Sequence, residues 1–70
     1  MDKREYIESC KKRALSEKTK LQKLASMMSD LKKNPETENH ENLKLIEIIV
    51  LGNQWKVSSD EEIEDLIMAF

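Results

Sequence analysis

The sequence predicts an α+β domain with a long N-terminal amphipathic helix, a β-hairpin and a short C-terminal helix. Three observations support this fold class. Apolar residues recur at heptad spacing through residues 2–33, two β-prone runs flank a Gly-Asn pair within residues 43–58, and a capped amphipathic segment occupies residues 59–69. Residues 34–42 are polar, rich in Asn, and contain the one proline, so they are expected to form a loop.

The N-terminal segment, residues 2–33, has the pattern of one continuous helix. Asp2 and Glu5 have the spacing of a capping box, and Pro35 cannot continue the helix. The repeat is coiled-coil-like, and we call its core positions the heptad seam. The heptad seam consists of Ile7, Cys10, Ala14, Glu17, Leu21, Leu24, Met28 and Leu31.

The charged residues that flank the heptad seam are all positive. They are Lys11, Arg13, Lys18, Lys20 and Lys32. Two such helices packed against each other would bring like charges together in either a parallel or an antiparallel arrangement. The seam is therefore expected to pack against an acidic segment rather than against its own copy.

Residues 43–58 admit two interpretations. A hairpin with Gly52 and Asn53 as its turn would carry a uniformly apolar face, made of Ile46, Ile48, Val50, Trp55 and Val57. The alternative is a second helix from about Glu41 to Leu51, closed by Gly52, which would make the protein an all-α three-helix domain. That helix would be apolar on nearly all sides, and a domain of 70 residues has little room to bury it.

The segment 59–69 has clear helix signals. Ser59 and Glu62 form a capping box, and the first turn is acidic. One face is apolar, and the opposite face carries acidic residues. The apolar residues are Ile63, Leu66, Ile67 and Phe70, and the acidic ones are Glu61, Glu64 and Asp65. This helix is the expected acidic partner of the basic heptad seam.

Length and charge indicate one small domain, residues 1–70, with two halves of opposite sign. Residues 1–33 contain ten Lys or Arg and five Asp or Glu, a net charge of +5. Residues 34–70 contain two Lys and nine acidic residues, a net charge of −7. The halves are expected to attract each other, within one chain or between two.

No motif for catalysis, a cofactor or a metal is visible. Cys10 is alone and lies in the seam, His40 is alone in a loop, and Gly52 is the one glycine. We therefore expect a protein that is not an enzyme. A single cysteine suits a reducing compartment, and neither a signal peptide nor a membrane-spanning apolar run is present, so a cytoplasmic location is expected.

A continuous helix over residues 2–33 would be about 48 Å long and would extend beyond anything that the remaining residues can cover. The sequence thus predicts a regulatory, adaptor or inhibitor type of interaction module, as an intertwined homodimer or with another protein partner. The expected surface is Leu21, Leu24, Met28, Leu31, Ile63, Leu66, Ile67 and Phe70. The alternative is nucleic-acid binding through Lys11, Lys12, Arg13, Lys18, Lys20 and Lys23.

Overall fold

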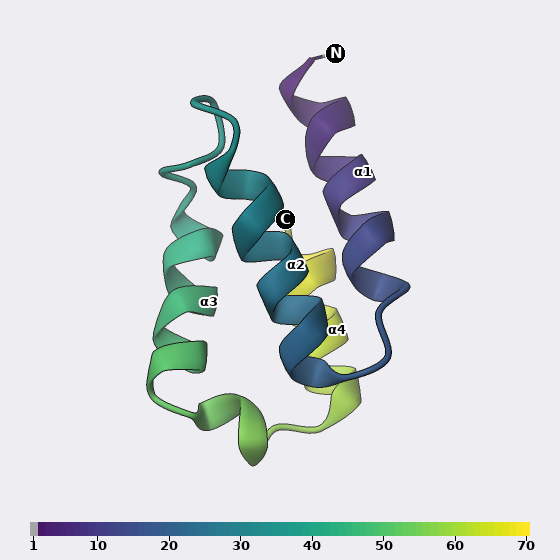
Figure 1. Ribbon diagram of the computed structural model, residues 1–70, viewed down its shortest axis with the longest axis vertical. Coiled ribbons are helices and arrows are strands. Elements are labelled where there is room, and N and C mark those ends of the chain that lie inside the picture. The colour runs from purple at the N-terminus through teal and green to yellow at the C-terminus, as the bar shows by residue number, and fades with distance from the viewer. Residues whose placement is uncertain (1) are drawn as a thin grey trace.

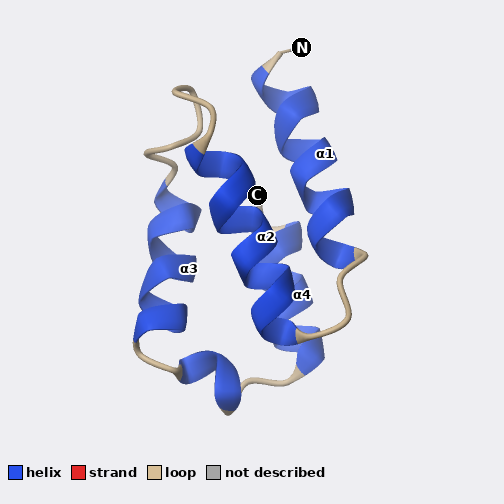
Figure 2. Cartoon of the chain, viewed as in Figure 1, coloured by secondary structure: helices blue, strands red, loops and turns tan. Residues whose placement is uncertain are grey.

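A computed structural model describes residues 2–70, and all regular structure in that range is helical (Figures 1 and 2). Residues 2–70 form four α-helices and one short 3-10 turn. Their bounds are α1 Lys3–Leu15, α2 Lys20–Lys32, α3 Glu41–Leu51, η1 Gln54–Lys56 and α4 Asp60–Met68.

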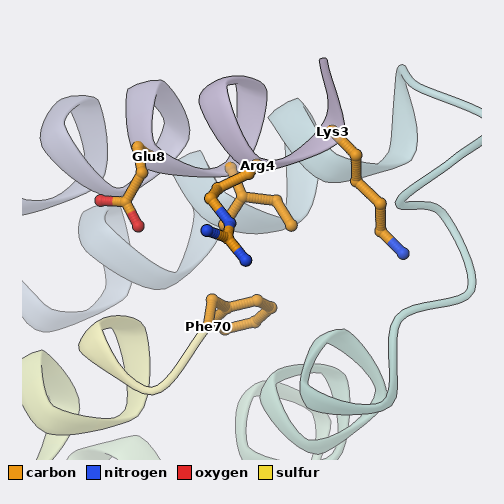
Figure 3. A pocket seen from close by; sticks show the side chains of 5 residues that line it. Lys3, Arg4, Glu8 and Phe70 are labelled. Atoms are coloured by element: carbon orange, nitrogen blue, oxygen red, sulfur yellow. The ribbon is translucent and has the colours of Figure 1, made fainter.

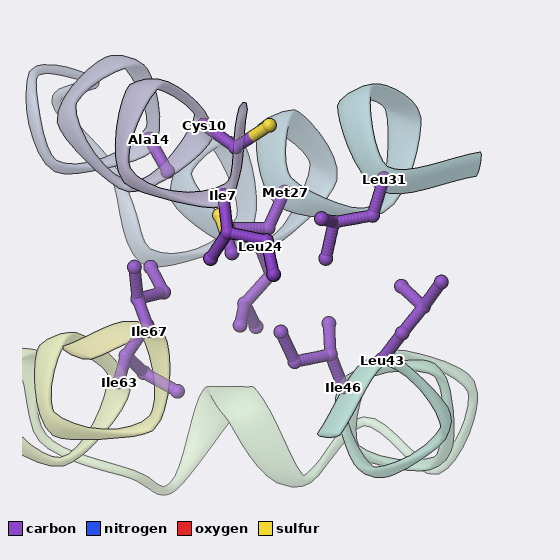
Figure 4. Close-up of a cluster of buried hydrophobic side chains, with 10 residues drawn as sticks. All are labelled: Ile7, Cys10, Ala14, Leu24, Met27, Leu31, Leu43, Ile46, Ile63 and Ile67. Carbon is purple, nitrogen blue, oxygen red and sulfur yellow. The ribbon is translucent and has the colours of Figure 1, made fainter. Parts of the chain in front are cut away.

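Successive helices run in opposite directions, and α2 is the central one (Figure 1). It packs against α1, α3 and α4, and α1 also packs against α4. In an end-on view, α1 and α2 form one layer above α4 and α3, with the apolar side chains between them (Figure 4).

The predicted continuous helix over residues 2–33 is wrong, because the chain leaves the helical conformation between α1 and α2. Ser16 ends α1, and Thr19 begins α2 with a capping box. The Thr19 hydroxyl accepts the Gln22 N–H at 3.1 Å, and the Gln22 side-chain oxygen accepts the Thr19 N–H at 3.3 Å. The break lets α1 and α2 fold back as an antiparallel pair, and the molecule measures only 35 × 21 × 16 Å.

The break also changes which residues of α2 face the core. Leu24, Met27 and Leu31 are fully buried, whereas Leu21, a predicted seam residue, is 37 % exposed. Met27 lies outside the predicted heptad seam, so the buried face of α2 is rotated relative to that register. In α1 the predicted register is retained, with Ile7, Cys10 and Ala14 buried.

The predicted hairpin over residues 43–58 is also wrong, and with it the α+β fold class. The segment forms α3, and its bounds, Glu41–Leu51, agree with the helix that was the alternative interpretation. Leu43 and Ile46 are fully buried, so α3 contributes to the core through helical rather than alternating spacing. Packing thus overrides the β propensity of the branched side chains. The all-α alternative had the correct class but three helices, one fewer than the structure contains.

The predicted turn residues close α3 instead of joining two strands. The Gly52 N–H donates to the Ile48 carbonyl at 2.9 Å, as expected at a helix C-terminus. Asn53 has a φ of 59°, in the left-handed region that Asn tolerates better than most residues. The chain then passes through η1 to Ser59, whose side chain accepts the Glu62 N–H at 3.1 Å and begins α4.

The core contains side chains from all four helices (Figure 4). In the loop between α2 and α3, Thr37 is buried, and its hydroxyl donates to the Leu31 carbonyl at 2.6 Å. The buried apolar residues are Ile7, Cys10, Ala14, Leu24, Met27, Leu31, Leu43, Ile46, Ile63 and Ile67.

Candidate protein-interaction surface

The most exposed apolar stripe on a helix lies on the outer face of α3. Leu45, Ile48 and Leu51 are 49 %, 60 % and 80 % exposed, and their spacing of three residues places them along one side of the helix. We call these three residues the α3 ridge. They point away from the core because the opposite side of α3 supplies Leu43 and Ile46. A helix at residues 41–51 is apolar on nearly all sides, and the fold leaves the outer side of α3 exposed.

A shallow groove separates α3 from α4. The two helices pack against α2 rather than closely against each other, and the space between them has a volume of about 440 Å³. The Asn42 side-chain amide donates to the Ala69 carbonyl at 3.3 Å and links the two helices. The residues that line this α3–α4 groove are Ile49, Ser58, Glu62, Asp65, Leu66 and Ala69.

The α3–α4 groove combines an apolar lining with negative charge. Ile49 and Leu66 are half-buried and pack against the core cluster. Glu62 and Asp65 supply carboxylates, and none of the lining residues is a cation. The Glu62 carboxylate accepts the Ser59 N–H at 3.1 Å, whereas Asp65 is exposed and forms no ion pair within residues 2–70. Asp65 is thus the more available charge of the two.

The residues predicted as a self-association surface largely meet one another inside a single chain. Leu24 and Leu31 of α2 and Ile63 and Ile67 of α4 are fully buried in the core. The acidic helix α4 therefore packs against the basic α1–α2 pair of its own chain, whereas the intertwined dimer predicted from the sequence would place α4 against a second chain. The remaining predicted residues are an exposed Leu21 and half-buried Met28, Leu66 and Phe70.

Most of the predicted anion-binding cations are engaged within the chain. Lys23 is buried, and its ammonium group pairs with the Glu64 carboxylate at 2.6 Å. The Lys20 ammonium donates to the Ser58 carbonyl at 2.6 Å. In the part of the chain that the structure describes, Lys12 and Lys18 are exposed and form no ion pair. Two more of the predicted anion-binding cations form ion pairs, Lys11 with Glu8 at 3.2 Å and Arg13 with Asp30 at 2.9 Å.

Cys10 is fully buried on α1, beside polar contacts that join α1 to α2. The Tyr6 hydroxyl donates to the Asp30 carbonyl, and the Arg13 guanidinium pairs with the Asp30 carboxylate. Burial raises the pKa of the Cys10 thiol, and the Asp30 charge raises it further. A reactive cysteine needs a lowered pKa and access to solvent, so this arrangement favours a packing role for Cys10.

The reaction of Cys10 with a thiol reagent such as Ellman's reagent should be slow in native buffer and fast in denaturant. In the folded protein the thiol is inaccessible and its pKa is raised, so little thiolate is present to react. Absorbance of the released thiolate measures both rates. Equal rates in native and denaturing buffer would show that the α1–α2 contact does not protect this residue.

His40 lies at the end of the loop, where the sequence places it, and it caps α3. Its Nδ1 atom accepts the Asn42 N–H at 3.1 Å, and its ring lies 5.0 Å from the Phe70 ring. The capping contact uses one ring nitrogen, and the His40 and Phe70 rings are tilted by 39° to each other. These interactions give His40 a structural role in joining the start of α3 to the end of the chain.

A second hollow, of about 590 Å³, lies between the first turns of α1 and the end of the chain (Figure 3). Ile7 and Phe70 supply its apolar atoms, and Lys3, Arg4 and Glu8 surround them. Its rim therefore carries charges of both signs, unlike the uniformly acidic rim of the α3–α4 groove.

Within residues 2–70, no three His, Cys, Asp or Glu side chains are grouped so that they could hold a metal ion. None of the helices in this range has the length and apolar character needed to cross a membrane. In comparisons with known proteins, no protein-family model, curated protein or solved structure matches this chain.

Proposed function

We propose that this protein is a non-enzymatic interaction module of the regulatory, adaptor or inhibitor type, and that it binds another protein through the α3 ridge. The observation that carries the proposal is the exposure of Leu45, Ile48 and Leu51 along one side of α3. Single exposed apolar residues are normal on protein surfaces, but a contiguous apolar stripe is typical of an interaction site.

Folding gives little reason for apolar residues at Ile48 and Leu51, which are 60 % and 80 % exposed. A side chain that remains mostly in water contributes little hydrophobic stabilisation, about 25 cal/mol for each Å² that is removed from water. Polar residues at 45, 48 and 51 would therefore leave the helical face that packs against α2 unchanged. Apolar surface that the fold does not use is available to a partner.

The distribution of charge favours a protein partner over nucleic acid. Lys20 and Lys23 are held by groups of the same chain, so the basic stripe has few free cations with which to neutralise phosphates. The intertwined homodimer was expected because a long helix would overhang the rest of the chain. That overhang does not exist, since α1 and α2 fold against each other. Binding of a second copy of this chain is therefore an alternative that the experiment must distinguish.

The proposed function can be tested by capture from a lysate of the source cells with the full chain as bait. Ile48→Asp should reduce the recovery of at least one protein about tenfold, because a charge in the centre of an apolar interface is costly. Circular dichroism should show that the variant remains as helical as the wild type.

Met68→Asp is the matched control. Met68 is 59 % exposed against 60 % for Ile48, and it lies on α4 outside the α3 ridge and the α3–α4 groove. This variant should retain the partner that Ile48→Asp loses. If both variants and the wild type capture the same proteins in the same amounts, the α3 ridge is not an interaction site. If sedimentation shows a dimer that Ile48→Asp abolishes, the partner is a second copy of this chain.

A further inference from the structure

The shape of the α3–α4 groove suits an added helix. Its lining residues Glu62, Asp65, Leu66 and Ala69 recur at spacings of three and four along α4, so the groove follows the axis of that helix. α3 runs in the opposite direction to α4 (Figure 1) and contributes Ile49 to the lining. Ile49 and Leu66 supply its apolar atoms, and Leu45 of the α3 ridge lies one turn before Ile49 on the same side of α3. An amphipathic helix binds such a groove through apolar residues spaced by three and four positions.

The charge around the groove selects the type of helix. Glu62 and Asp65 line it, no lining residue is a cation, and residues 34–70 have a net charge of −7. A partner with basic residues beside its apolar stripe would gain attractive contacts and faster association. A partner with acidic flanks would be repelled.

A second copy of this chain does not meet that requirement. Its acidic half would face the same acidic half, and like charges opposed across an interface are destabilising. Its basic helix α1 is not available either, because Ile7, Cys10 and Ala14 are buried in their own core, and Tyr6 and Leu15 are packed against that core. The occupant must therefore come from a different protein.

From these observations we infer that the α3–α4 groove binds a basic amphipathic helix of a partner protein. The inference rests on the proposed function and specifies its partner. Apolar side chains of the partner helix contact Ile49, Leu66 and Leu45, and its Lys or Arg side chains pair with Asp65 and, at the end of the groove nearer Ser59, with Glu62. The α3 ridge forms the outer edge of the interface.

The test uses two fluorescently labelled, stapled helical peptides and the full-length protein, with fluorescence anisotropy as the measurement. Both peptides carry the same leucine stripe, and they differ only in flanking residues, which are lysines in one and glutamates in the other. The lysine peptide should bind at least about tenfold more tightly, and added salt should reduce the difference.

Two variants identify the binding site. Asp65→Lys should weaken binding of the lysine peptide about fivefold, by reversing one charge at the rim. Ala69→Trp should weaken binding of both peptides, because the new ring occupies the groove. Glu61→Lys is the matched control, since Glu61 is an exposed residue of the same helix that does not line the groove, and it should leave the affinity within about twofold.

The possible results separate this inference from the proposed function. Absence of binding, equal binding of the two peptides, or equal effects of Glu61→Lys and Asp65→Lys would overturn the inference. The capture experiment with Ile48→Asp would then decide the proposed function by itself. A dimer in sedimentation that Ala69→Trp dissociates would also overturn the inference, because the groove would then hold a second copy.

Discussion

Replacing Leu24 with Asp should unfold the protein in buffer where the wild type is folded. Leu24 is fully buried in α2, the helix that packs against all three others. An unpaired carboxylate at this position costs several kcal/mol, and the total stability of a domain of this size is about 5 kcal/mol. Circular dichroism should show loss of helix, and urea should produce no cooperative transition.

Leu21→Asp is the control that separates the structure from the sequence-predicted register. Leu21 and Leu24 both belong to the predicted heptad seam, but Leu21 is 37 % exposed. Its replacement should cost about 1 kcal/mol, measured from the shift of the urea midpoint at constant slope. Equal destabilisation by the two variants would indicate that the predicted heptad seam is continuous. The buried face of α2 would then not be the one made of Leu24, Met27 and Leu31.

A second large effect is expected at Ile46, where Asp should also unfold the protein. Ile46 is fully buried on the side of α3 that faces the core. Ile48, two residues later, is 60 % exposed, so Ile48→Asp should change the free energy of unfolding by less than about 1 kcal/mol. The comparison uses the same residue type and the same substitution, and urea denaturation measures both.

This pair distinguishes a helix from a strand at residues 43–51. In a hairpin, residues 46 and 48 lie on the same face, and both substitutions would be equally harmful. In a helix the two residues point in nearly opposite directions, so the effects should differ by several kcal/mol. Similar losses of stability at both positions would contradict α3.

Local signals in the sequence located the ends of several elements. Asp2 caps α1, with its carboxylate accepting the Glu5 N–H at 2.8 Å, and Ser59 caps α4. The same type of signal was present at Thr19 and Gln22, where it marks the start of α2. The heptad pattern concealed it, because Ala14 and Leu21 keep the heptad spacing on either side of this break, although Glu17 interrupts the apolar seam between them.

The candidate interaction surface could not be predicted in full from the sequence. Leu45, Ile48 and Leu51 were recognised as part of an apolar segment, but their exposure depends on which side of α3 contacts α2. The groove lining brings Ile49 together with Asp65 and Leu66 from a helix distant in sequence, and nothing local specifies that pairing. The predicted surface included Leu66, since its apolar periodicity was visible, while Leu24 and Ile63 of the same predicted surface are core residues.

The sequence by itself determined the charge division of the chain, the apolar faces of α1 and α4, and the caps at Asp2 and Ser59. These properties depend on residues within one or two helical turns of each other. Tertiary structure alone decided that residues 43–51 are helical, that Leu21 faces solvent, and that the acidic helix α4 covers its own chain. Each of these outcomes depends on burying the largest apolar area among four short helices at once, and that sum includes contacts between segments far apart in the sequence.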